Sequence, residues 1–215
     1  MTTVVDAYLV AATSAASLLA DPAVAERWLS PSALPEYRVS GLAGHLASQV
    51  FAVATALEVA GSTTTRPEVV PLEEHYRRAR WLGAGVDDDI HVLIRSRGEG
   101  IAAPGAEALA EQTAETVDRL RDDLPKQPHD LALAVPGGSW AMYLEHFLTT
   151  RLMELTVHSD DLAYSVGIAT PELPEEVLER VFALLTRLSV QRHGPTALLR
   201  ALSRTERAPR SISAL

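Results

Sequence analysis

The spacing of apolar residues limits this chain more than any other feature. They recur every three or four positions along most of its 215 residues, and alternation with a period of two is almost absent. A period of three to four residues is that of an amphipathic α-helix, so we expect an all-α protein. Helices are predicted at residues 4–19, 41–60, 72–82, 89–97, 106–124, 140–166, 174–191 and 196–202.

Prolines and glycines fall between these predicted helices and mark the turns that connect them. Four of the helices are long enough to cross a small domain, which favours a four-helix bundle. The pair within residues 72–97 is predicted to be an insertion on the outside of that bundle. We therefore expect the bundle in residues 1–170, and extra C-terminal helices in residues 171–215 that pack on it as an extension.

Composition and charge exclude several classes of protein. Hydrophobic residues make up 47% of the chain, enough for a globular core, and there is no cysteine to form a disulfide, a thiolate metal site or a nucleophile. A net charge of −9 argues against nucleic-acid binding. Charged residues or glycine interrupt each apolar stretch before the about 18 residues of a membrane helix, so we expect a cytoplasmic protein that is not in a membrane.

The predicted helix 140–166 carries a polar stripe in an unexpected place. Its members are Phe147, Arg151, Glu154, His158 and Asp161, and apolar residues flank the stripe on both sides. A carboxylate in such surroundings needs a cation, a metal or its own proton. Glu154 and His158 are four residues apart, so both side chains can reach a single ion.

A third metal ligand is predicted from the segment 41–60, where His45 is surrounded by apolar residues and lines up with Gln49. Two histidines and one glutamate are typical of catalytic zinc sites that keep one coordination position open. Nickel, iron and manganese accept the same ligands. The alternative is a hydrogen-bonded structural role for His45 and a buried ion pair between Glu154 and Arg151.

Two blocks of spaced residues carry a family resemblance. The first comprises Trp28, Pro31, Ser32, Leu34, Pro35, Tyr37, Val39, Leu42, His45 and Leu46. The second comprises Arg151, Glu154, Val157, His158, Asp161, Leu162 and Ala163. Together they resemble the N-terminal domain of the mycothiol-dependent maleylpyruvate isomerases, in the DinB-like metal-binding superfamily. The family typically has tryptophan at the position of Asp160.

The resemblance implies a DinB-like four-helix bundle in which His45, Glu154 and His158 hold Zn²⁺ or another divalent metal. It also implies that mycothiol, a low-molecular-weight thiol, is a cosubstrate in transfer or isomerisation on a small electrophile. The isomerase itself continues into a C-terminal domain that contributes to activity, whereas few residues follow Gly167 here. We therefore expect chemistry other than maleylpyruvate isomerisation, such as thiol transfer or hydrolysis of a thiol adduct. A metal- or ligand-binding bundle without catalysis is the alternative.

Asp161 and Arg151, which also belong to the stripe, each have two possible roles. Asp161 is predicted either to accept a hydrogen bond from a histidine ligand or to cap the surface of the helix. Arg151 is predicted either to bind a carboxylate of the substrate or to balance the charge of Glu154. No catalytic residue is assigned from the sequence.

Overall fold

The computed structural model describes residues 2–62 and 67–215, and most of these residues are helical. The helices are α1 (Val4–Leu19), α2 (Pro22–Glu26), α3 (Val39–Ser62), α4 (Leu72–Arg78), α5 (Asp89–Ala102), α6 (Ala106–Asp123), α7 (Leu144–Val166), α8 (Glu175–His193) and α9 (Pro195–Ser203). The strands are β1 (Glu68–Val69), β2 (Ala132–Ala134) and β3 (Trp140–Tyr143). The prediction of a helical protein is confirmed, and the structure adds a small sheet that the sequence did not indicate.

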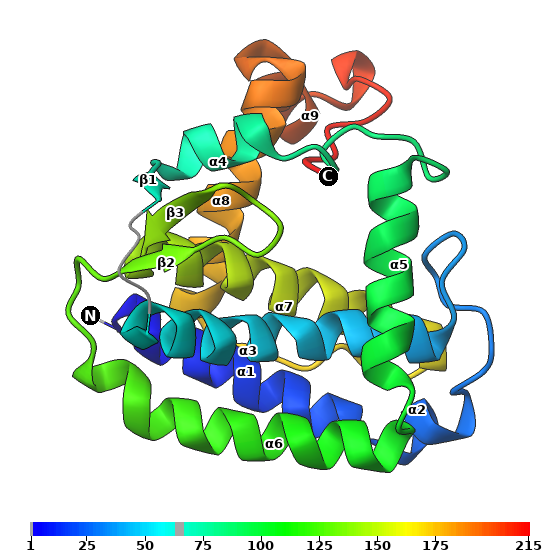
Figure 1. Ribbon diagram of the computed structural model, residues 1–215. Coiled ribbons are helices and arrows are strands. Elements are labelled where there is room, and N and C mark those ends of the chain that lie inside the picture. Colours follow the sequence, from blue (N-terminus) through cyan, green and yellow to red (C-terminus); the bar gives the residue numbers. More distant parts are fainter. Residues whose placement is uncertain (1, 63–66) are drawn as a thin grey trace. The chain divides into compact units, whose positions relative to one another are not determined.

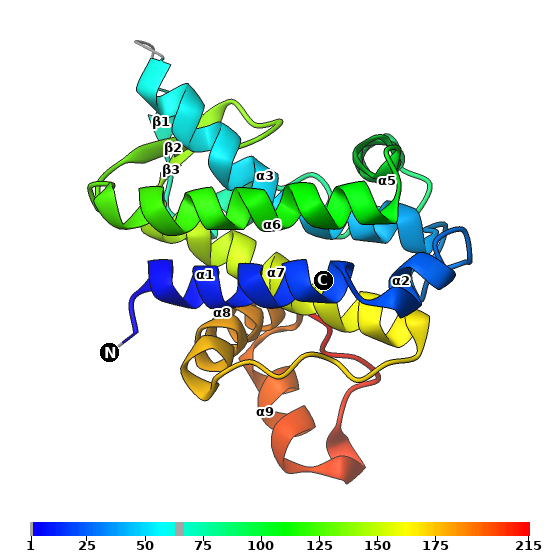
Figure 2. The ribbon, with the colours of Figure 1, turned by 90° about the horizontal axis from the view of Figure 1, so that it is seen from below.

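Four long helices, α1, α3, α6 and α7, lie side by side and enclose most of the core (Figures 1 and 2). α1 and α3 each contact both α6 and α7. Local signals fix the ends of two of them. Thr3 and Asp6 form a capping box at the start of α1, and Gly167, at φ +77°, ends α7 in the left-handed conformation that glycine adopts readily.

The sheet corrects the predicted start of the helix 140–166. Residues Trp140–Tyr143 form β3, which lies between β1 and β2, parallel to the first and antiparallel to the second. Ala141 and Met142 are both fully buried, so this short apolar run shows no alternation. A strand that is buried on both faces cannot be told from a helix by periodicity, which is why the sequence predicted a helix here. β3 leads directly into α7.

Helix α5 also differs from its predicted range, because it continues through Gly98 and Gly100 to Ala102. It crosses α3 in direct contact (Figure 1). A Cβ atom on Gly44 would overlap the carbonyl oxygen of Gly98, and one on Gly98 would overlap that of Gly41. The two backbones therefore touch, and the glycines that looked like helix breakers allow this close approach.

The chain divides into two compact units, Met1–Leu173 and Pro174–Leu215. The first holds α1 to α7 and the sheet, and the second holds α8 and α9. The packing of residues 171–215 on the bundle stays a prediction. By length and composition α3 could span a membrane, but half of its apolar window is buried in the structure, as in the core helix of many soluble proteins.

Candidate metal centre

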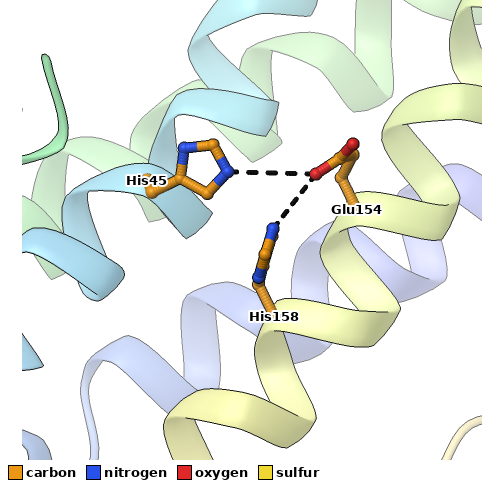
Figure 3. A group of neighbouring side chains, drawn as sticks. All are labelled: His45, Glu154 and His158. Carbon is orange, nitrogen blue, oxygen red and sulfur yellow. Dashed lines mark hydrogen bonds and ion pairs between the residues drawn. The ribbon is translucent and has the colours of Figure 1, made fainter. Parts of the chain in front are cut away.

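Three polar side chains from two helices point toward one another in the first unit (Figure 3). His45 comes from α3, and Glu154 and His158 come from successive turns of α7. Nε2 of His158 lies 3.1 Å from Oε2 of Glu154, and Nε2 of His45 lies 3.8 Å from the same oxygen. The two imidazole rings meet edge to face, with 4.6 Å between their centroids. The structure thus brings together the three residues that the sequence selected.

The donor atoms of these residues fit the requirements of a divalent ion. All three lie within 4.8 Å of one another, and in residues 2–62 and 67–215 no other group of three or more histidine and acidic side chains does so. Ligands bound about 2.1 Å from a tetrahedral ion lie roughly 3.4 Å apart, close to the distances found here. Two neutral nitrogens and one carboxylate oxygen suit zinc and several transition metals.

The site is sheltered and still reachable from solvent. The side chains of His45, His158 and Glu154 are 17%, 15% and 12% exposed. Such partial exposure lets a small ligand approach, while the surrounding protein weakens screening by water and strengthens the interactions between charges. Three protein ligands leave at least one coordination position for such a ligand.

Electrostatics set the protonation of the metal-free side chains. Burial lowers the pKa of His45 because it disfavours the imidazolium. Burial alone would raise the pKa of Glu154, but hydrogen bonds with His158 and His45 hold it well below its usual range. Burial also opposes the charged form of His158, yet hydrogen bonds with Asp161 and Glu154 raise its pKa to about 9. A metal at this site must therefore displace a proton from His158.

Asp161 lies one turn beyond His158 and contacts its other ring nitrogen. Oδ2 of Asp161 is 2.9 Å from Nδ1 of His158. When Nδ1 carries the proton of the neutral ring, it donates a hydrogen bond to this carboxylate. The lone pair of the ring is then on Nε2, which faces Glu154 and His45. Of the two roles predicted for Asp161, the geometry favours the one that orients the ligand histidine.

Arg151 contacts neither Glu154 nor any other carboxylate at ion-pair distance within the described residues, although its charge helps to keep Glu154 ionised. Its Nη1 donates a hydrogen bond of 2.6 Å to Oε1 of Gln49, and its Nε donates one of 3.1 Å to Oγ1 of Thr150. Arg151 therefore does not form the direct ion pair with Glu154 that was the alternative to a metal site, and its effect on the pKa of Glu154 agrees with the other expectation, that it balances the charge of this carboxylate. The sequence did not assign Gln49 a role, although a polar side chain four residues after His45 on an apolar face was the available signal.

Comparison with known proteins gives a family and no individual relative. The family model described as the mycothiol maleylpyruvate isomerase N-terminal domain matches residues 9–163. This range covers most of the chain and contains all three candidate ligands. No curated protein and no solved structure matches the chain.

Proposed function

The chain belongs to the mycothiol maleylpyruvate isomerase N-terminal domain family, and from this premise we propose that it binds a divalent metal, most simply zinc, through His45, Glu154 and His158. We further propose that the protein is cytoplasmic and uses this metal with mycothiol or a similar thiol in transfer or isomerisation on a small electrophile. The observation that carries the proposal is the convergence of the three donor atoms within 4.8 Å. The contacts among α1, α3, α6 and α7 support a DinB-like four-helix bundle as its scaffold.

Each side chain has a distinct part in this proposal. Glu154 supplies a negative charge that offsets part of the charge of the ion, and the two histidines supply neutral nitrogen ligands. Asp161 holds the ring of His158 in place through Nδ1, so that Nε2 faces the ion once its proton has been displaced. When bound, a divalent ion favours thiolate over thiol and can polarise a carbonyl group. Because the chain has no cysteine, the sulfur must come from a separate molecule.

The test uses Co²⁺ in place of zinc, because cobalt absorbs visible light and reports its ligands. We expect metal-loaded protein to gain a sulfur-to-cobalt charge-transfer band when mycothiol is added, and His45→Ala protein to show none. Glutathione serves as the control thiol and tests selectivity. Consumption of the thiol together with an added electrophile then measures turnover.

Two outcomes separate the proposal from its alternative. Protein that binds cobalt but shows no sulfur band with either thiol would support a metal-binding bundle without thiol chemistry. Protein that takes up no metal would remove the basis of the whole proposal.

A further inference from the structure

We propose that Gln49 and Arg151 form a bridge between α3 and α7 that positions His45 against Glu154 and His158. This inference rests on the proposed metal site and adds two positioning residues to it. Neither residue is proposed to bind the ion. The bridge acts through the backbone that carries His45.

Two hydrogen bonds connect the helices in sequence. Nη1 of Arg151 on α7 donates to Oε1 of Gln49 on α3, at 2.6 Å. Nε2 of the same glutamine then donates to the main-chain oxygen of His45, at 3.1 Å. One side chain of α7 is thereby tied to the residue of α3 that must supply the third ligand.

The bridge lies one helical turn from the candidate ligands. Gln49 follows His45 by four residues, and Arg151 precedes Glu154 by three. Residues at these spacings lie on the same face of a helix. The separation of α3 and α7 at the bridge therefore sets their separation at the metal site, where Nε2 of His45 and Oε2 of Glu154 are 3.8 Å apart.

Both members of the bridge are held in place by other groups. Gln49 is 2% exposed, and its main-chain oxygen accepts a hydrogen bond from the buried hydroxyl of Tyr8. The guanidinium of Arg151 lies 5.6 Å from the centre of the Phe147 ring and also bonds to Thr150. A charge-assisted hydrogen bond between such fixed partners is among the stronger ones in proteins. The helices are thus set for the ion before it binds.

The experiment measures Zn²⁺ affinity by competition with a chromophoric chelator, together with the melting temperature of each metal-free variant. Gln49→Met and Arg151→Met remove the bridge from either side, and we expect each to weaken Zn²⁺ binding by about 10- to 100-fold, as for other groups that orient metal ligands. The double variant should lose no more than one single variant, because both changes remove the same bond. Gln49→Glu keeps an acceptor for Arg151 but has no N–H to donate to the main-chain oxygen of His45, so it should also weaken Zn²⁺ binding.

Gln112→Met, at an exposed position of α6, is the matched control and should leave the affinity unchanged. If Gln49→Met does not fold, Arg151→Lys gives the same test with the charge kept, because lysine lacks the planar guanidinium whose Nη1 and Nε bond Gln49 and Thr150. Folded variants without the bridge that bind Zn²⁺ as tightly as the wild type would overturn the inference, as would additive losses in the double variant. Wild-type protein that binds no Zn²⁺ would instead overturn the proposed site and the bridge with it.

Discussion

The two helices that form the candidate site differ in how their contributions are fixed. α7 holds Glu154, His158 and Asp161 within two turns, so the helical repeat alone brings these side chains together. α3 contributes only His45, whose place depends on contacts with α5 and α7 that are distant in the sequence. One half of the site is thus local and the other half depends on tertiary packing. The predictions that follow test this difference, beginning with the packing of α3.

The largest effect is expected from the glycine contact between α3 and α5. Gly98→Ala places a methyl group against the carbonyl oxygen of Gly41, and we expect the free energy of unfolding to fall by about 3 kcal/mol, at the upper end for overpacking. Gly100→Ala lies two residues away on the same helix with open space around it, and should raise stability by up to about 1 kcal/mol. Chemical denaturation measures the free energy of unfolding of both variants. Equal effects of the two substitutions would contradict a backbone contact at Gly98.

A smaller effect is expected in the local half of the site. Asp161→Asn weakens the support of His158 and should reduce Zn²⁺ affinity by about 10- to 100-fold. Asp160→Asn is the control, because Asp160 contacts Thr170 and not a candidate ligand. The Zn²⁺ affinity of both variants is measured by competition with a chromophoric chelator. Similar affinities in the two would show that Asp161 does not orient the histidine.

The third prediction concerns pH. His158 has a raised pKa of about 9 in the metal-free protein, so protons compete with the metal below that value. We expect Zn²⁺ affinity to fall by about tenfold for each pH unit below 9, and to level off above it, because one proton is released on binding. Affinity titrations at several pH values measure this slope. No dependence on pH between 7 and 9 would exclude His158 as the group that is deprotonated.

The raised pKa of His158 also makes the stability of the metal-free protein depend on pH. A histidine whose pKa is higher in the folded state stabilises that state when it is protonated. This contribution is full below pH of about 6.5, the ordinary histidine value, and is lost as pH rises through 9. Metal-free protein should therefore become less stable across this range, and Asp161→Asn should show a smaller decrease in denaturation experiments.

The same division between local and tertiary contacts explains what the sequence could predict. The bounds of α1 were predicted correctly because the apolar period and the capping residues Thr3 and Asp6 are local. The polar stripe of α7 was visible for the same reason. β3 was not predicted, because its short buried run does not alternate and its strand character comes from pairing with β2 and with β1, the second more than seventy residues earlier.

Tertiary packing also explains the two other differences. Gly98 was interpreted as a helix breaker, since no local signal shows that α3 lies against it. Arg151 was predicted to balance the charge of Glu154, its neighbour on the same helix, or to bind substrate, and no local signal showed that its hydrogen-bond partner is Gln49, 102 residues away. His45 itself was selected from its apolar surroundings and the family resemblance, and its distance to Glu154 needed the fold.

The measurement that tests the central claim most directly is the metal content of the purified protein, combined with its melting temperature before and after chelation. We expect about one divalent ion per chain, and a lower melting temperature without it, because an ion that binds only the folded state stabilises that state. Glu154→Ala protein that keeps its helical circular dichroism should contain no ion and should not respond to the chelator. Wild-type protein without metal, and with a melting temperature that neither Zn²⁺ nor the chelator changes, would contradict a metal centre at His45, Glu154 and His158.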